Sequence, residues 1–479
     1  MVSINGDGSG SKITSTNKKL SIVTCEGCCD LLALHASNKK RYPFLLQSTS
    51  SQNKNSRFDI LFAFPQHSLT LNNNFKLYVD NKLCANNNFL EQLDQLFIKQ
   101  KTTKNDEQSR FKLPFTGGWF LYLAYELLGQ IENKVKTHIL SQGQDIAVAV
   151  RIPSAIIYDR HEDTSYLLSE CNYKNNILIL ENDYKKYYKK NNDKNKIHLF
   201  QLKDLINTAT EEPAEVFFNR IKKVKKYIHE GDIFQANLSR EWCISIAQEL
   251  NSTELYTNLT QKNPSAFSGI LYFGELTIIS SSPERLIQIK NGFIEARPIA
   301  GTSKRVTDKK TDIELATNLL NHPKEKAEHI MLVDMERNDL GRVCKAGTVK
   351  LSELMMLESL AHVHHIISNI KGELKSDVTP AKIIKAVFPG GSITGCPKVR
   401  CMEIIHELEG EARNSYTGSM GYLNNNGDMD LNILIRTIEH KNSTLSFRTG
   451  AGIVNDSIPE NELEETRIKA KGLLSAIYE

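Results

Sequence analysis

The feature that most constrains the fold is an amphipathic segment, Pro213 to Glu230, which ends at a glycine and leads directly into a strand-like run. Its apolar residues recur at helical spacing, at Phe217, Phe218, Ile221, Val224 and Ile228, which predicts a helix with one buried face. Gly231 suits the left-handed position that closes such a helix, and the apolar run at 233–238 predicts a strand.

Other segments of the chain also show the spacing of helices or strands, but no internal sequence repeat is found. Compact apolar runs between about 20 and 170 predict short strands joined by turns. Further strands are predicted at 276–280, 416–423, 430–438 and 445–448, and helices at 322–333, 378–387 and 397–409. We therefore predict a disordered N-terminus (1–17), an N-terminal subdomain (18–171), a poorly ordered or solvated Asn- and Lys-rich connector (172–211) and a C-terminal domain (212–479).

Charge and composition limit the class of protein. The 479 residues carry a formal net charge of +4, spread along the chain, which argues against a nucleic-acid binder. Because no apolar run approaches the roughly 18 residues needed to span a bilayer, no membrane partner is expected. The polar start, 1–17, lacks the apolar region of a signal peptide, and nine scattered cysteines suit a reducing compartment. A cytoplasmic protein is predicted, in which the Cys25, Cys28 and Cys29 run consists of ordinary thiols rather than a zinc site.

Two Glu-x-x-Glu pairs are candidates for a metal site: Glu325 with Glu328, and Glu462 with Glu465. A spacing of three residues on a helix places both carboxylates on one face. Two such helices facing each other would offer four carboxylates, the hard oxygen donors that suit Mg²⁺. Each pair taken alone also fits a solvated face balanced by nearby lysines.

Other polar residues could act singly. Glu284 follows a serine-rich strand and a proline, where it could serve as a general acid, and Thr302 lies in a turn-like segment at 295–305. On a strand, His362 and His364 would share a face and His365 would take the other, whereas on a helix His362 and His365 would be neighbours. Neither arrangement supplies a third ligand at a zinc-like spacing. Each of these groups also fits an ordinary surface loop.

Two glycine-rich segments could approach a ligand through their backbones. The run 388–398 can present amide groups to an anion but lacks the spacing of a phosphate-binding P-loop. The segment Gly450-Ala451-Gly452 follows a predicted strand, and Arg436 on the strand before it could form a fork to a carboxylate. Simple turns and a surface arginine remain the alternatives.

Taken in order along the chain, these segments resemble those of the chorismate-utilising enzymes. The similar segments in the C-terminal part are 231–239, 282–284, 297–302, 333–342, 391–400, 450–452 and 462–469. The segments 43–48 and 117–120 extend the resemblance, more loosely, to nearly the whole chain. It implies an α+β fold, a large two-layer antiparallel β-sheet sandwich flanked by helices. Residues 212–479 would form the chorismate-binding catalytic domain, and 18–171 a subdomain like the N-terminal part of anthranilate synthase component I, with a tryptophan-type pocket.

The resemblance also implies roles for individual residues. Glu328 and Glu465 would ligate Mg²⁺, and Glu325 and Glu462 would hold its waters or complete its shell. Glu284 would be the general acid/base, with His365 and Thr302 contacting the leaving oxygen. The two carboxylates of chorismate would be held by Tyr416, Arg436, Lys469 and the segment Gly450, Ala451 and Gly452.

Within the family the chain is most similar to the aminodeoxychorismate synthase component I group, whose product leads through 4-aminobenzoate to folate. The segments that point there are 235–237, 357–365, 390–394, 417–422 and 427–432. Ala300 argues for the close relative, anthranilate synthase component I, because the aminodeoxychorismate enzymes often carry a nucleophilic lysine there. Gln235 stands where members that use water carry lysine, which fits ammonia as the nucleophile. Since the chain has no Gly-x-Cys-x-Gly segment, the ammonia would come from a separate glutamine amidotransferase subunit.

Overall fold

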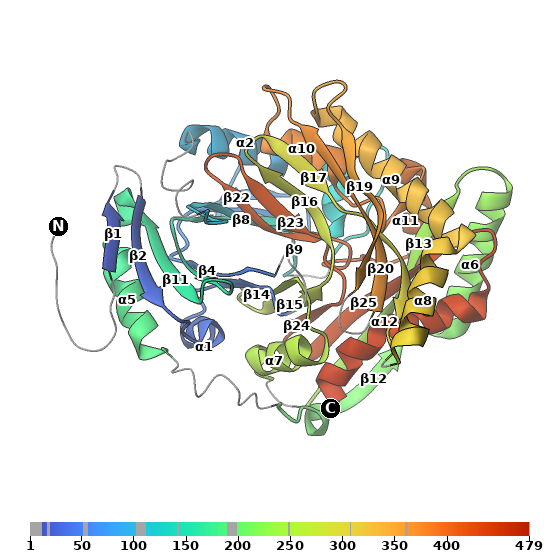
Figure 1. Ribbon diagram of the computed structural model, residues 1–479, viewed down its shortest axis with the longest axis horizontal. Coiled ribbons are helices and arrows are strands. Elements are labelled where there is room, and N and C mark those ends of the chain that lie inside the picture. Colours follow the sequence, from blue (N-terminus) through green and yellow to red (C-terminus); the bar gives the residue numbers. More distant parts are fainter. Residues whose placement is uncertain are drawn as a thin grey trace.

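Two large antiparallel sheets packed face to face, with helices on their outer sides, make up the protein (Figure 1). This computed structural model describes residues 12–16, 20–50, 56–101, 112–140, 143–188, 199–247, 250–306, 308–359 and 363–478. The predicted fold class, an α+β two-layer sandwich flanked by helices, is confirmed.

The first sheet has thirteen strands, and each of its pairings is antiparallel. Twelve follow one another in the order β1 (Lys12–Thr16), β2 (Leu20–Glu26), β11 (Thr164–Glu170), β10 (Ser154–Asp159), β4 (Phe58–Ala63), β3 (Phe44–Gln47), β14 (Phe267–Phe273), β15 (Leu276–Ser282), β24 (Thr437–Lys441), β25 (Thr444–Ile453), β13 (Gln235–Ile246) and β12 (Ile206–Glu211). The short β21 (Gly395–Cys396) also pairs with β13.

The second sheet has twelve strands, again antiparallel. Eleven are ordered β18 (Ile299–Lys304), β20 (Val363–Glu373), β17 (Phe293–Ala296), β16 (Arg285–Lys290), β23 (Met429–Asn432), β22 (Ser419–Asn424), β8 (Gly118–Leu123), β9 (Asp145–Ile152), β5 (Ser68–Asn72), β6 (Leu77–Val79) and β7 (Lys82–Leu83). The twelfth, β19 (Lys350–Ser359), pairs with β20.

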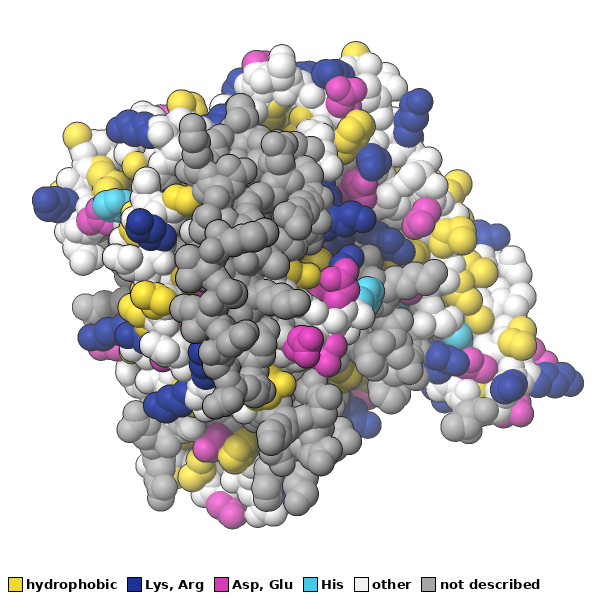
Figure 2. Space-filling model, turned by 60° about the vertical axis from the view of Figure 1, so that its left-hand side comes forward, with side chains coloured by type: hydrophobic (Ala, Val, Ile, Leu, Met, Phe, Trp, Pro, Cys, Tyr) yellow, Lys and Arg dark blue, Asp and Glu magenta, His cyan; other side chains and the backbone are white. Residues whose placement is uncertain are grey.

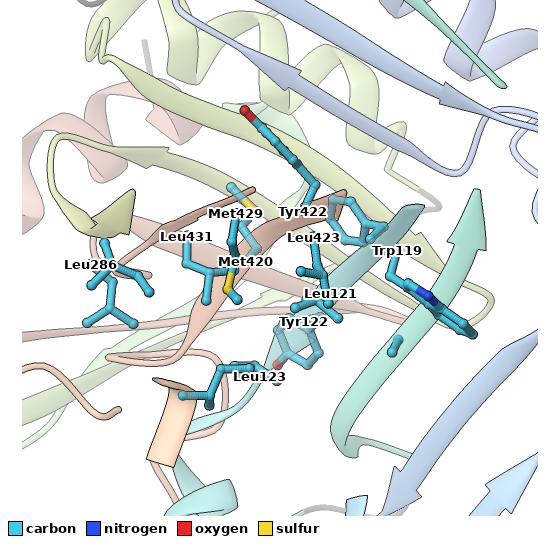
Figure 3. Packing of buried hydrophobic residues seen from close by; sticks show 14 of the residues in the cluster. Trp119, Leu121, Tyr122, Leu123, Leu286, Met420, Tyr422, Leu423, Met429 and Leu431 are labelled. Atoms are coloured by element: carbon cyan, nitrogen blue, oxygen red, sulfur yellow. The ribbon is translucent and has the colours of Figure 1, made fainter. Parts of the chain in front are cut away.

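Apolar side chains from both sheets fill the space between them. Alternate residues of a strand point to opposite faces, and all six residues of β8 are buried, so this strand is covered on both faces. The Phe120 ring of β8 stacks on Phe44 of the first sheet, with centroids 4.0 Å apart. Figure 3 shows Leu121 and Leu423, from the paired strands β8 and β22, within the same cluster.

The helices lie mainly on the outer faces of the two sheets. Apolar residues of α1 (Leu31–Ser37), α5 (Asn176–Lys186), α7 (Ser252–Lys262) and α12 (Pro459–Tyr478) pack on the first sheet. The second sheet is covered by α2 (Phe89–Gln100), α8 (Lys309–Asn321), α9 (Pro323–Val343) and α10 (Pro380–Val387). The helices α6 (Ala214–His229) and α11 (Lys398–Glu409) pack on β13, and short turns form α4 (Leu128–Ile131), η1 (Tyr125–Leu127), η2 (Cys171–Tyr173) and η4 (Lys203–Leu205).

The predicted segments differ from the observed arrangement in two ways. Residues 12–16, predicted to be disordered, form β1, and residues 172–211, predicted to be a poorly ordered or solvated connector, include the ordered helix α5 and the largely exposed strand β12. Burial of Ile177, Leu180 and Tyr184 at helical spacing holds α5 in place, a pattern obscured in the sequence by the surrounding Asn and Lys. Residues 1–11 and 189–198 lie outside the described residues.

The two predicted subdomains also share both sheets. In the first sheet β3 pairs with β14, where Gln47 lies opposite Ser268. In the second sheet β8 pairs with β22, where Leu121 lies opposite Gly421. Strands from before and after the predicted connector therefore enclose one apolar core.

The surface drawn in Figure 2 carries Lys and Arg side chains interspersed with Asp and Glu. This mixture agrees with the small formal net charge of +4. Within the described part of the chain, no helix combines the length and the apolar character that crossing a membrane requires.

Candidate active site

Glu284 lies in the short loop that joins β15 to β16, and only 9% of it is exposed. Its Oε1 accepts a hydrogen bond from Ser392 Oγ at 2.8 Å. Burial raises the pKa of Glu284 to about 7, although this hydrogen bond and the charges of Lys469 and Arg436 act in the opposite direction. A carboxyl group with this pKa can donate a proton near neutral pH.

The paired strands β13 and β25 form one wall of the site. Gly450 and Gly452 lie opposite Ser239 and Asn237, and both glycines are closely approached by side chains. A Cβ at Gly450 would lie 2.5 Å from Tyr416 Oη, and one at Gly452 would lie 2.4 Å from Gln235 Nε2. The pleat turns Ala451 away from the site, where it packs among α6 and α11.

Gln235 begins β13 and connects this wall to the carboxylates. Its Nε2 donates to Glu328 Oε1 at 3.2 Å. Its Oε1 is buried and has no hydrogen-bond partner among the described residues. A buried acceptor without a partner is costly to a fold, so this atom is available for a ligand.

A second wall comes from β18 and β20. Ala300 is buried in β18, and Thr302 lies opposite His365 of β20, although the Thr302 side chain is not among those described. The His365 ring donates to the Gly301 carbonyl, and burial lowers the pKa of His365 to about 4, with the Arg436 charge adding to the effect. His365 is therefore a neutral imidazole at neutral pH. The strand alternative for the histidines is confirmed from Val363 onward, while His362 lies outside the described residues.

Arg436 lies in a turn rather than on the predicted strand 430–438, which is interrupted between β23 and β24. Its φ of +52° places it in the left-handed region, which non-glycine residues rarely adopt. The side chain reaches Asn263, donating from Nη1 to Oδ1 at 3.1 Å, and burial lowers the pKa of the guanidinium. This backbone conformation directs the charge toward Glu284 and His365 and is of the kind that clusters at functional sites.

The two Glu-x-x-Glu pairs lie on the helices α9 and α12, and Glu328 of the first pair is close enough to Glu465 of the second for their charges to interact. Burial raises the pKa of Glu328, and the neighbouring Glu325 and Glu465 raise it further. Burial also raises the pKa of Glu462, and Glu465 adds to this effect. The four carboxylates therefore repel one another, as expected where a cation is to be held.

Lys469, one turn beyond Glu465 on α12, partly balances these charges. Its Nζ lies 2.7 Å from Glu465 Oε1 and donates to the Gly450 carbonyl at 2.9 Å. The structure thus brings every predicted site residue into one connected region, apart from Ala451, which points away, and the Thr302 side chain, which is not described.

Sequence reasoning gave no role to Ser392, Asn263 and Asn237. The first two contact Glu284 and Arg436 across more than a hundred residues of chain, and no local spacing could reveal such contacts. Asn237 Oδ1 is buried without a partner in the described part of the chain and would lie 2.7 Å from a Cβ at Gly450. Asn237 belongs to the segment 235–237, which carries part of the resemblance, and this could have marked it as a site residue.

The family model described as chorismate binding enzyme matches residues 42–475. The chain belongs to this family. It is 36% identical over 457 residues to anthranilate synthase component 1 of Bacillus pumilus, covering 92% of this chain and 88% of that protein. It is 37% identical over 390 residues to aminodeoxychorismate synthase component 1 of Bacillus subtilis, covering 79% of this chain and 80% of that protein.

A solved structure agrees with these relatives. The crystal structure of anthranilate synthase component I from Streptococcus pneumoniae superposes with a TM-score of 0.76 at 30% identity, covering 87% of this chain and 92% of that one. The protein is thus a chorismate-utilising enzyme.

The chemistry of the acidic residues fits the Mg²⁺ predicted for this family, because the donors are carboxylate oxygens that repel one another. As they stand, no three His, Cys, Asp or Glu side chains among the described residues are grouped closely enough to hold a metal ion. Lys469 neutralises Glu465 in this state. Binding of the ion would require the carboxylates to draw together and Lys469 to release Glu465.

A network of buried charged residues holds the strand β13 and the Tyr416 ring in place. Glu409 at the end of α11 accepts from Arg413 Nε at 2.8 Å and from the Ser239 amide at 2.8 Å. Arg448 lies 3.8 Å from the same carboxylate, and the Arg413 guanidinium lies 5.5 Å from the centre of the Tyr416 ring. Burial alone would raise the pKa of Glu409, but these cations and hydrogen bonds lower it to about 2. The network therefore fixes both Tyr416 and β13.

A separate cavity of about 600 Å³ lies between the sheets, lined from β3, β14, β16 and β22. Ser48 and the Arg285–Asp430 ion pair contribute to its wall. None of the predicted site residues lines it. The resemblance implies a tryptophan-type pocket in the N-terminal region. Because strand β3 of that region lines this cavity, binding of an amino acid here stays a prediction.

Proposed function

We propose that this enzyme aminates chorismate with ammonia and releases 4-amino-4-deoxychorismate, the precursor of 4-aminobenzoate for folate. The observation that carries the amination is Gln235, whose amide can neither take nor give up a proton at neutral pH. Its buried Oε1 lacks a partner among the described residues and can accept a hydrogen bond from ammonia. A lysine at this position, as in members that use water, could act as a base.

The walls of the site provide the groups that amination of chorismate needs. Glu284, whose pKa is about 7, would protonate the departing C4 hydroxyl, and neutral His365 would contact that oxygen. Arg436, Lys469, Tyr416 and the Gly450–Gly452 backbone would hold the two substrate carboxylates. Since the substrate is a dianion beside four glutamates, the positive charges of Arg436 and Lys469 would also offset the repulsion between the substrate and these carboxylates.

We further propose that Glu328 and Glu465 hold Mg²⁺, with Glu325 and Glu462 completing its shell or binding its waters. When bound, the ion would act as a Lewis acid on the substrate. Movement of Lys469 from Glu465 to a substrate carboxylate would leave the Glu465 oxygens free for the ion.

Glu465→Gln is expected to lower activity by at least about 100-fold and to raise the Mg²⁺ concentration needed for half-maximal rate, because one charged ligand is lost. The exposed position of Glu465 predicts an unchanged unfolding temperature. Glu464→Gln, which alters the adjacent exposed residue on α12, is the matched control. Unaltered turnover and Mg²⁺ dependence in the Glu465 variant would remove it from the metal site.

The ammonia is proposed to come from a glutamine amidotransferase subunit. The relatives are named component 1 of their enzymes, a name that implies a second component. We place both subunits in the cytoplasm, in agreement with the scattered cysteines of this chain.

Anthranilate is the second candidate product. Ala300 has no side chain that could attack the substrate ring, and several of the relatives, including the one from Bacillus pumilus, are named anthranilate synthase. Several segments resemble aminodeoxychorismate synthase, whereas only this one position favours anthranilate synthase. We therefore propose 4-amino-4-deoxychorismate as the product.

Product analysis separates the two candidates. The purified chain is incubated with chorismate, Mg²⁺ and an ammonium salt, and the product is identified by chromatography and mass. Aminodeoxychorismate is the expected result, whereas anthranilate would assign the enzyme to tryptophan synthesis. A reaction without ammonium is the control for a product formed with water.

A further inference from the structure

Glu336, on α9, is a buried glutamate to which none of the roles above applies. Only 8% of it is exposed. Three charged groups face it from the elements around it: Asp339 one turn further along α9, Lys398 from α11, and Glu284 from the β15–β16 loop. Lys398 is already bound to Asp339, with Nζ 2.9 Å from Oδ2, so it does not form an ion pair of its own with Glu336.

The Glu336 carboxyl contacts the glycine-rich loop that precedes β21. A Cβ at Gly391 would lie 3.5 Å from Glu336 Oε1 and 2.7 Å from Met335 Cε, so the loop approaches α9 closely here, and a larger residue would displace the end of the Met335 side chain. The Gly391 amide donates a hydrogen bond to the Glu336 carboxyl. The Gly391 carbonyl accepts from the amides of Thr394 at 3.2 Å and Gly395 at 3.1 Å. Glu336 thus supplies the acceptor for the amide of this residue.

The next residue of the loop reaches the acid of the candidate site. Ser392 Oγ donates to Glu284 Oε1 at 2.8 Å. Gly391 and Ser392 therefore link two buried carboxyl groups, since the Gly391 amide donates to Glu336 and the Ser392 hydroxyl donates to Glu284.

We propose that Glu336 is a positioning residue, which holds the Gly391 amide and thereby keeps the Ser392 hydroxyl on Glu284. It does not touch the substrate in this scheme. It acts through the loop, and the atom that matters is an acceptor oxygen rather than a charge.

The charges around Glu336 favour the neutral form of its carboxyl group. Burial raises the pKa of Glu336 to about 8, and Asp339 and Glu284 add to this effect while Lys398 and the Gly391 amide oppose it. The carboxyl is therefore mostly protonated at neutral pH and places little negative charge beside Glu284. A glutamine side chain offers the same carbonyl acceptor at the same distance from the backbone.

The test compares two substitutions of similar volume. Glu336→Met removes the acceptor, and kcat for chorismate is expected to fall about 10-fold with KM unchanged, the size expected for one lost hydrogen bond. Glu336→Gln keeps the acceptor, and wild-type kcat is expected. Met335→Leu changes the apolar contact with the same glycine and serves as the packing control. Should the methionine variant fail to fold, Glu336→Asp, which draws the oxygens back by one methylene, tests the same contact.

Two further readouts distinguish positioning from a structural role. Because the Ser392 hydrogen bond lowers the pKa of Glu284, its loss in Glu336→Met should move the high-pH limb of the rate profile to higher pH. Ser392→Ala should show the same fall and the same shift. Combining the two substitutions should add nothing further, because both remove one connected interaction.

Other results would overturn the proposal: wild-type kcat in Glu336→Met, an equal loss in Glu336→Gln, or losses that multiply in the double variant. The inference rests on the proposed chorismate chemistry, so rates are followed by loss of chorismate, whichever amine forms. If the wild-type protein consumes no chorismate, the proposed function fails; if it does and the variants match it, the role of Glu336 fails.

Discussion

Replacing Glu284 with glutamine is expected to lower kcat for chorismate by about 10²- to 10⁴-fold, the usual contribution of a general acid. The glutamine has the shape of the protonated carboxyl and keeps the acceptor for Ser392 Oγ. It cannot release a proton to the departing hydroxyl. Binding of chorismate should therefore change little, and the loss should appear in kcat.

The pH profile gives this prediction a direction. The pKa of Glu284 is about 7, and the acid acts only when protonated, so the wild-type rate should fall as pH rises through about 7. This limb should be absent from the residual activity of Glu284→Gln. Glu275→Gln, on the exposed turn between β14 and β15, is the control. A glutamine variant with more than a tenth of wild-type kcat would show that another group supplies the proton.

Glu409→Gln is expected to destabilise the fold by about 3–5 kcal/mol, because it leaves the charge of Arg413 buried without its partner. Both side chains are about 1% exposed and lie 2.7 Å apart. Urea unfolding at pH 7 measures the change. Glu411→Gln removes a carboxylate that is 62% exposed and lies 3.7 Å from Arg448, and should cost less than about 1 kcal/mol.

The contribution of Glu409 should also depend on pH. Its pKa is about 2 in the folded protein, against an ordinary value of 4.5. The stability it adds is therefore fully present above about pH 4.5 and is lost as pH falls toward 2. The difference between wild type and Glu409→Gln should shrink over that range. Equal stability of the two proteins at pH 7 would mean that the charge network does not support the fold.

Local periodicity predicted α6, α10, α11 and the first half of α9, but it did not predict α7, α8 or the strands β16 to β20. The apolar spacing of 214–229 and the carboxylate spacing of both Glu-x-x-Glu pairs correspond to the helices α6, α9 and α12. Periodicity failed where distant residues decide the structure. The left-handed turn at Arg436 interrupts a run that looks like one strand, and its side chain is held by Asn263 from another part of the chain.

The members of the candidate site were proposed from the resemblance and their roles stay predictions, whereas the contacts between them could not be predicted from the sequence. The resemblance identified Glu284 and Gln235, yet the contacts with Ser392 and Glu328 join residues about a hundred positions apart. Such contacts depend on how the sheets pack, which no single segment encodes. The order in the connector was not predicted because polar residues outnumber the few apolar ones that hold α5.

The shared sheets have a consequence for how the chain folds during synthesis. Leu123 of β8 pairs with Ser419 of β22, nearly three hundred residues later. At about 5–20 residues per second, β8 leaves the ribosome some 15–60 s before its partner strand exists. Until then the edge of β8 stays open to pairing with other chains, while the edge of β3 stays open until β14 has been made. Expression of the N-terminal half alone should therefore yield aggregates, and nascent chains should depend on chaperones that shield exposed strands.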